Sequence, residues 1–117
     1  MRCTKELKIV VGEFIGTAIF LTVTFGAIAQ FVLGATDFYP VYIGHTVGLM
    51  LGIFFARNLS GAHLNPAVTM ALMVFRTPKS FKRMPLYFLG QFLGAFLAAA
   101  IVFGLFSGEF TFSLLFF

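Results

Sequence analysis

Residues 60–69 read SGAHLNPAVT, a polar and proline-containing stretch between two apolar runs. Lipid hydrocarbon disfavours irregular backbone, because each unpaired polar group costs several kcal/mol there. Asn65 can cap a helix with its side-chain oxygen, and Pro66 fits the first helical position, where an N–H has no intrahelical partner. The pair therefore predicts a helix that begins at Pro66 and ends near Phe75, shortly before Pro78.

The predicted helix 66–75 is too short to cross a bilayer. Ten residues at about 1.5 Å each span roughly 15 Å, which is half of the hydrocarbon core. Residues 57–64 would then form a re-entrant loop, with carbonyl acceptors beside the amide of Asn65 and with the positive helix end opposing cations. Such a loop can bind a small neutral solute. The alternative is a cytoplasmic loop followed by a surface helix.

The composition of the whole chain is that of a membrane protein. Of its 117 residues, 60% are hydrophobic and 10% are charged, and its mean hydropathy is +1.01. Soluble domains carry about 25% charged residues. Apolar runs at about 9–33, 38–56 and 84–106 predict an all-α membrane protein in one domain, residues 1–117, with three transmembrane helices plus the re-entrant half-helix.

The positive charges follow a single pattern along these spans. All eight Lys and Arg residues precede the first span, follow the second or precede the third. The positive-inside rule therefore predicts a multi-pass protein with a cytoplasmic N-terminus and with its C-terminus on the opposite side, expected in the plasma membrane. Because the charges flank apolar runs, they do not indicate nucleic-acid binding. Cys3 is the only cysteine, and the two histidines lie far apart, so we expect no metal site.

Small residues recur at four-residue spacing in each predicted span. Glycines on one helical face let two backbones approach closely, although membrane helices are also generally rich in glycine. The presence of the pattern in all three spans favours packing. The candidate packing positions are Gly12, Gly16, Gly44, Gly48, Gly52, Gly90 and Gly94.

Taken together, these segments resemble the aquaporin family. SGAHLNPAVT resembles its first signature loop, and the resemblance covers roughly residues 6–106. The other matching segments lie in the first and third spans: EFIGT at 13–17, PLY at 85–87, Gln91, GAF at 94–96, and AIVFGL at 100–105, the last being similar to the glycerol-conducting branch, the aquaglyceroporins.

The resemblance implies a passive solute pore. Asn65, in the sequence Asn65-Pro66-Ala67, would donate to the solute at the pore centre. Glu13 and Gln91 would support the loop, and the high cost of a buried unpaired charge independently requires a partner for Glu13. Alternatively, Glu13 snorkels to the cytoplasmic surface. The carbonyls that would line the cytoplasmic half of the path belong to Gly61, Ala62 and His63.

His45 is a second polar residue within a predicted span, twenty positions before Asn65. The resemblance implies that it contributes to the outer selectivity constriction. Glycerol-conducting members usually carry an aromatic residue there, whereas some relatives permeable to water, ammonia or urea carry histidine. The alternative is a histidine that packs between helices and bonds to a neighbour.

The family's pore consists of two inverted repeats, and this sequence resembles the first repeat only. Residues 107–117 do not resemble the family's continuation. We predict a passive channel for water and small neutral solutes such as glycerol or urea, whose partners are the lipid bilayer and other aquaporin subunits or a second repeat. The alternative is a non-conducting truncated fragment that packs with full-length subunits and modulates them. We expect neither enzymatic activity nor a cofactor.

Overall fold

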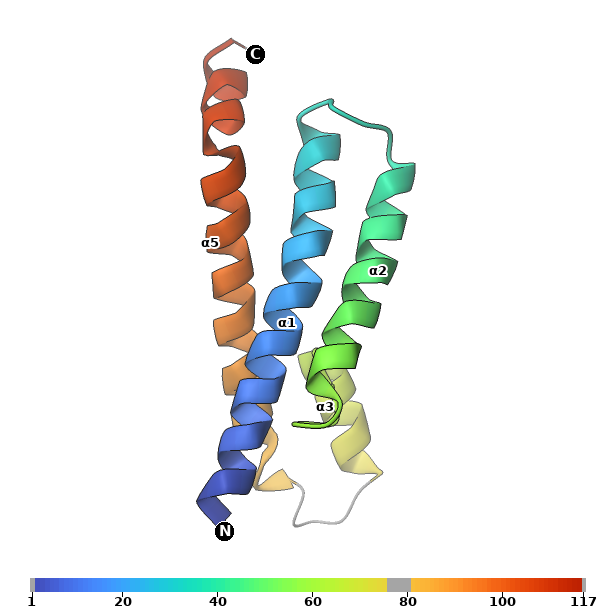
Figure 1. Ribbon diagram of the computed structural model, residues 1–117, viewed down its shortest axis with the longest axis vertical. Helices are drawn as coiled ribbons and strands as arrows, with labels where there is room; N and C mark the ends of the chain where they lie inside the picture. Colours follow the sequence, from blue (N-terminus) through green and yellow to red (C-terminus); the bar gives the residue numbers. More distant parts are fainter. Residues whose placement is uncertain (1, 76–80, 117) are drawn as a thin grey trace.

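The computed structural model describes residues 2–75 and 81–116, and they form helices, turns and short loops (Figure 1). The molecule is elongated, with principal dimensions of 54 × 24 × 21 Å. Its helices are α1 (Arg2–Val32), α2 (Tyr39–Ala56), α3 (Pro66–Val74) and α5 (Met84–Phe116).

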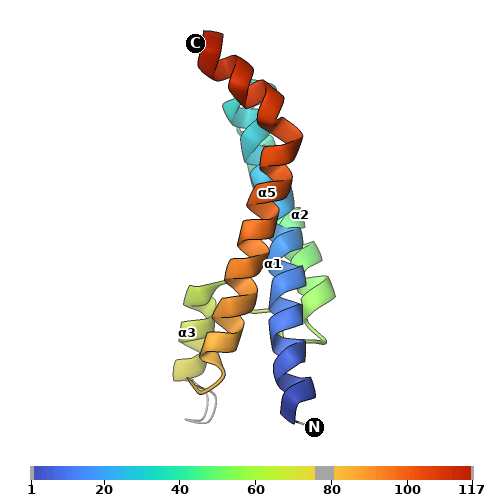
Figure 2. The same ribbon diagram turned by 90° about the vertical axis from the view of Figure 1, so that its left-hand side faces the viewer.

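Helix α1 occupies the centre of the bundle, between α2 on one side and α5 on the other (Figure 1). Helix α3 lies beside α5 at the end of the bundle that holds the N-terminus (Figure 2). The C-terminus lies at the opposite end. Among the described residues, three helices are long and apolar enough to cross a membrane, namely Thr4–Val32, Tyr39–Ala56 and Met84–Phe112.

Two helices are longer than the apolar runs that predicted them. Helix α1 begins at Arg2 rather than at residue 9, and α5 continues to Phe116 rather than ending near residue 106. Both extensions have a simple cause. Hydrophobicity marks the part of a helix that lipid can surround, whereas a helix ends where backbone hydrogen bonding is interrupted. No proline follows Pro85, so nothing in the sequence stops α5 earlier.

Glycines set the distance between the helices. A Cβ added at Gly90 or Gly94 would lie 2.6 Å from the carbonyl oxygen of Val10 or Phe14 on α1, and one added at Gly48 would lie 2.7 Å from that of Phe20. These are backbone contacts, so a larger residue would have to separate the helices. A Cβ at Gly52 would lie 2.7 Å from the Gly16 carbonyl oxygen, whereas at Gly12, Gly16 and Gly44 the nearest atoms, at 2.5–2.8 Å, are side-chain carbons.

Candidate functional site

Helix α3 packs against α5, and the side chain of Asn65 caps its first turn. Asn65 has extended backbone angles, φ −154° and ψ 132°, and its Oδ1 accepts the N–H of Ala67 at 2.8 Å. Pro66 occupies the first helical position, where its missing N–H leaves no bond unmade. Oδ1 is used by the cap, and the Asn65 side chain is exposed, so its NH₂ group remains accessible as a hydrogen-bond donor.

Three residues of the loop before α3 have positive φ angles. The φ angles are +89° at Gly61, +55° at Ala62 and +54° at Leu64. This region costs a residue with a side chain roughly 1–2 kcal/mol, so surrounding contacts must hold Ala62 and Leu64 in it. Within residues 2–75 and 81–116, no hydrogen bond is accepted by the carbonyl oxygen of Gly61, Ala62 or Leu64. The loop thus carries several available acceptors.

The side chain of Glu13 on α1 accepts hydrogen bonds from the backbone of this loop. Its Oε1 accepts the N–H of His63 at 3.0 Å, and its Oε2 accepts the N–H of Leu64 at 2.7 Å. Gln91 on α5 donates its Nε2 to the same Oε2 at 2.7 Å. The carboxylate is 0% exposed, so it does not reach the surface. Three donors converge on one buried carboxylate, and such charge-assisted bonds are about twice as strong as neutral ones.

Thr69 connects the cap residue to this network. Its hydroxyl donates to the Asn65 carbonyl at 3.0 Å and accepts Gln91 Nε2 at 2.9 Å. His63 Nδ1 lies 3.2 Å from the same oxygen. A hydroxyl has one hydrogen and two lone pairs, so with its hydrogen on Asn65 it accepts from both Gln91 and His63. This assignment places a proton on His63 Nδ1.

Tyr87 closes the network on the side of α5. Its ring stacks on that of His63, with centroids 4.1 Å apart and planes inclined by 14°. Its hydroxyl donates to the Ser60 carbonyl at 3.0 Å. Side chains from α1, α3 and α5 therefore fix both ends of the left-handed loop, and the predicted residues Glu13, His63 and Gln91 meet in one place.

A cavity of about 170 Å³ opens beside the cap. It is lined by Asn65 and Pro66 of α3, by Thr17 and Phe20 of α1 and by Gln91 of α5, among others. His45 on α2 is exposed and lies outside this lining. Its ring meets Phe20 edge to face at a centroid distance of 5.0 Å, so Phe20 links His45 to the cavity.

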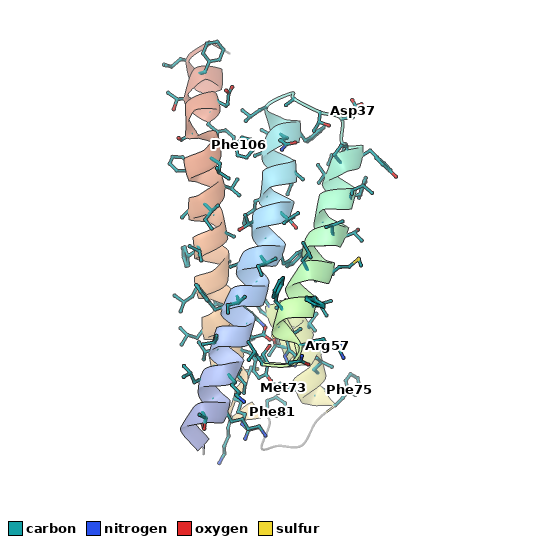
Figure 3. All side chains as sticks on the ribbon, in the orientation of Figure 1. Asp37, Arg57, Met73, Phe75, Phe81 and Phe106 are labelled. Carbon is teal, nitrogen blue, oxygen red and sulfur yellow. The ribbon has the colours of Figure 1, made fainter. Side chains whose placement is uncertain are left out.

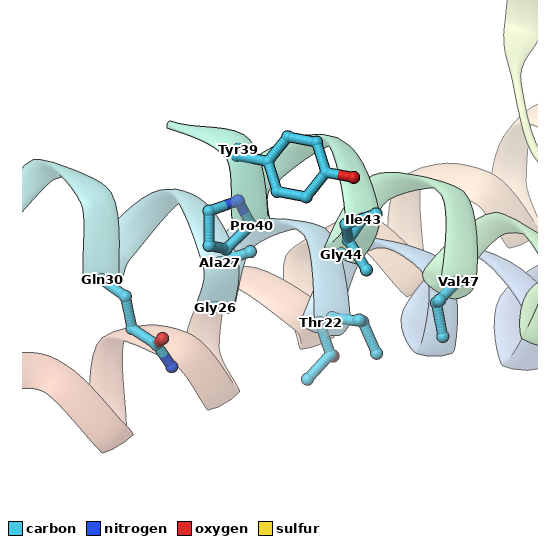
Figure 4. A pocket seen from close by; sticks show the side chains of 10 residues that line it. Thr22, Gly26, Ala27, Gln30, Tyr39, Pro40, Ile43, Gly44 and Val47 are labelled. Carbon is cyan, nitrogen blue, oxygen red and sulfur yellow. The ribbon is translucent and has the colours of Figure 1, made fainter. Parts of the chain in front are cut away.

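A groove of about 600 Å³ lies elsewhere. It runs between α1 and α2 near the turn that joins them, and Tyr39 and Pro40 cover one side of it (Figure 4). Of the predicted site residues, only Gly44 lines it. The groove is therefore separate from the network around Glu13 and from the cap at Asn65.

The sequence model of the family described as Major intrinsic protein matches residues 1–115. This chain belongs to the major intrinsic protein family. The predicted resemblance to aquaporins is confirmed, and the family is one of membrane channels rather than enzymes. The match also corrects one expectation, because it continues past residue 106 through residues that we expected to depart from the family pattern.

Individual members of the major intrinsic protein family agree with this assignment. The chain is 41% identical over 106 residues to the aquaglyceroporin of Plasmodium berghei, covering 89% of this chain and 41% of that protein. It is 39% identical over 109 residues to the glycerol uptake facilitator protein of Haemophilus influenzae, covering 91% of this chain and 41% of that protein. The chain thus spans about two fifths of the length of these relatives.

A solved member of the major intrinsic protein family has the same fold. The X-ray structure of the aquaglyceroporin from Plasmodium falciparum superposes with a TM-score of 0.80 at 33% sequence identity, over 92% of this chain and 45% of that one. The chain is an all-α integral membrane protein with the architecture of half of the aquaporin fold.

Three further residues of the network, Ser60, Thr69 and Tyr87, were not predicted as site residues from the sequence. Helical spacing offers a signal for two of them. Thr69 follows the cap at Asn65 by four residues, and Tyr87 precedes Gln91 by four residues, so each lies one turn from a predicted site residue on the same face.

Proposed function

We propose that this chain forms one half of a passive channel for water and small neutral solutes such as glycerol. The observation that carries the proposal is the left-handed loop, which keeps the carbonyls of Gly61, Ala62 and Leu64 available next to the Asn65 amide. A row of acceptors followed by a donor can replace the hydrogen bonds that a hydroxylated solute loses when it leaves water.

Cation exclusion follows from the same geometry. Helix α3 presents its N-terminus at Asn65, where its dipole contributes about half a positive charge. The Asn65 NH₂ group adds donors, and Glu13 is fully buried behind the loop with three bonds of its own. Neutral solutes therefore meet hydrogen-bonding groups, whereas a cation meets a positive potential.

In this proposal, a second half-channel supplies the remaining part of the pore. Asn65 and Ala67 are exposed at the N-terminal end of α3, and an opposing half-channel would cover them. The match covers 41% of each of two relatives, so these longer chains have room for a second half within one chain. Other aquaporin subunits or a second repeat are the partners that we propose here.

We also propose the direction in the membrane. Arg57 and Asp37 lie near opposite ends of α2 (Figure 3). Lys5 and Lys8 belong to the first turns of α1, and Lys82 and Arg83 directly precede α5, so these described basic residues lie at the end of the bundle that holds α3. The positive-inside rule then gives a cytoplasmic N-terminus, with the C-terminus on the far side of the plasma membrane.

Light scattering by lipid vesicles tests the channel. Vesicles with this chain, with the second half of a full-length aquaglyceroporin, or with both are exposed to a glycerol gradient. We expect flux only with both halves. Asn65→Asp keeps a capping oxygen but removes the NH₂ donors, so it should reduce flux to the level of empty vesicles while α3 stays folded.

Asn58→Asp is the matched control, because it adds the same charge at an exposed turn residue away from α3. Unchanged flux in Asn65→Asp would contradict the role of the amide. If the two halves give no flux but the chain lowers flux through a co-expressed full-length relative, the chain is instead a non-conducting fragment that modulates such channels.

A further inference from the structure

Thr17 on α1 bonds differently from other threonines in the helices. Thr24, Thr46 and Thr111 each donate the side-chain hydroxyl to the carbonyl oxygen four residues earlier, at 2.8–2.9 Å. The Thr17 side chain is 2% exposed, yet among the described residues its Oγ1 has no hydrogen-bond partner. Because a buried hydroxyl without a partner is costly, this one requires an explanation.

The side-chain oxygen of Gln91 on α5 is in the same situation. Gln91 is 3% exposed, and its Nε2 donates to Glu13 Oε2 and to Thr69 Oγ1. A carboxylate only accepts hydrogen bonds, so the amide nitrogen must face Glu13 and the amide oxygen must point away from it. Within residues 2–75 and 81–116, this Oε1 accepts no hydrogen bond.

These two buried oxygens belong to one place in the bundle. Thr17 lies one helical turn after Glu13 on α1, and Gln91 bonds Glu13 from α5. A Cβ added at Gly94, three residues after Gln91, would lie 3.0 Å from the Thr17 Cβ, so α1 and α5 are in close contact here. Thr17 and Gln91 also line the same cavity, which has a volume of about 170 Å³.

The chemistry of the two oxygens selects the ligand. Gln91 Oε1 can only accept, whereas Thr17 Oγ1 can both donate and accept, so the ligand must donate to the glutamine. The residues that line the cavity carry no charge, which gives an ion no advantage there. Water can donate to Gln91 and still bond Thr17, and buried waters commonly bridge polar groups that do not meet directly.

We propose that a resident water molecule bridges Thr17 Oγ1 and Gln91 Oε1 and joins α1 to α5 beside the cap of α3. The water completes the bonding of the amide whose nitrogen supports Glu13 and Thr69, so it holds that amide in the orientation that the loop requires. It is a structural water that exchanges slowly with bulk solvent, because both oxygens are buried. Its binding does not depend on the proposed channel function.

Equilibrium unfolding of the chain in mixed micelles tests the water through the sign of one substitution. Thr17→Val keeps the side-chain shape and removes the hydroxyl. If the water is bound, the variant removes one of its partners and should raise the unfolding equilibrium constant by about threefold to tenfold. If no water is bound, the same change removes a buried unpaired hydroxyl and should lower that constant.

Thr24→Val is the matched control for Thr17→Val. Thr24 is a buried threonine of the same helix, and its hydroxyl already bonds the Phe20 carbonyl. That carbonyl belongs to the helical backbone, and such a bond from threonine adds little to helix stability. The control should therefore change the unfolding equilibrium constant by about twofold or less.

Water-to-amide cross-relaxation in NMR detects the water in the unsubstituted chain. The chain has two glutamines, so side-chain ¹⁵N-glutamine labelling reports the NH₂ groups of Gln91 and of the exposed Gln30 only. We expect a slowly exchanging water at Gln91 and rapidly exchanging water at Gln30. The Gln91 signal should disappear in Thr17→Val and persist in Thr24→Val.

Other results overturn the proposal. They are a Gln91 amide without a slowly exchanging water, a Thr17→Val variant that is as stable as the parent chain or more stable, and equal effects of Thr17→Val and Thr24→Val. The NMR measurement on the unsubstituted chain decides the matter even if Thr17→Val does not fold. Vesicle flux tests the channel function separately.

Discussion

Leu64 donates its backbone N–H to Glu13 Oε2 over 2.7 Å, which joins two residues 51 positions apart. Leu64 is also the last left-handed residue before the cap at Asn65. The position of the cap in the membrane therefore depends on a carboxylate in α1. This dependence gives the first prediction.

Replacing Glu13 should unfold the re-entrant loop before it unfolds the helices. Glu13→Gln substitutes a donor for one acceptor where three donors converge, and we expect a loss of about 1–3 kcal/mol in unfolding free energy. Thermal unfolding in detergent measures it. Glu6→Gln is the control, because Glu6 is exposed on the same helix and should change stability by less than about 0.5 kcal/mol. Equal effects of the two variants would contradict the network.

Gly94→Ala should destabilise the bundle by about 1–3 kcal/mol, because its new Cβ would lie 2.6 Å from the Phe14 carbonyl oxygen. Gly104 on the same helix has no atom within 4 Å of such a Cβ. Gly104→Ala should therefore be neutral or gain up to about 1 kcal/mol from helix propensity. Equilibrium unfolding of the two variants in mixed micelles decides the matter, and a larger loss at Gly104 would refute the role of close backbone contact.

Ala62→Gly should be neutral or stabilising by up to about 1 kcal/mol, since glycine adopts φ +55° without a Cβ penalty. Ala62→Val should cost more than about 1 kcal/mol, because a branched Cβ is least tolerated there. The comparison of melting temperatures checks both. A destabilising glycine together with a harmless valine would show that the loop does not hold this conformation.

Thr69→Val should make local unfolding of α3 easier. The variant removes the hydroxyl that bonds Asn65, Gln91 and His63 but keeps the side-chain volume. Thr69→Ser keeps the hydroxyl. Hydrogen–deuterium exchange of the peptide that contains residues 66–74 should speed up in the valine variant and change little in the serine variant. Equal exchange in both would mean that packing, rather than the hydroxyl, holds the helix.

The helices and the cap were predictable because their signals are local. The two adjacent residues Asn65 and Pro66 are enough to indicate a helix start, and the length of each apolar run indicates a membrane span. The glycine spacing also indicated where helices would meet, and the structure has close contacts at those positions. The matching segments around Glu13 and Gln91 pointed to loop support through family resemblance, which carries long-range information.

Other features were not readable from the sequence because they depend on the tertiary structure. Nothing local specifies φ +54° at Leu64, since leucine avoids that region unless distant bonds impose it. The convergence of three groups on Thr69 needs α3, α5 and the loop together. The ring contact between Phe31 and Phe38 likewise depends on the turn after Val32, which brings the two residues together.

The span of Glu13's partners along the chain has a consequence for biosynthesis. His63 lies 50 residues after Glu13 in the sequence, and Gln91 lies 78 residues after it. The carboxylate is therefore synthesised long before either donor exists. At ribosomal speeds of about 5–20 residues per second, the last donor arrives roughly 4–16 s later. During that interval the nascent α1 carries an acidic group that only water or the insertion machinery can solvate. The helix should therefore remain at the translocon until the third span emerges, and release into lipid should follow completion of the network.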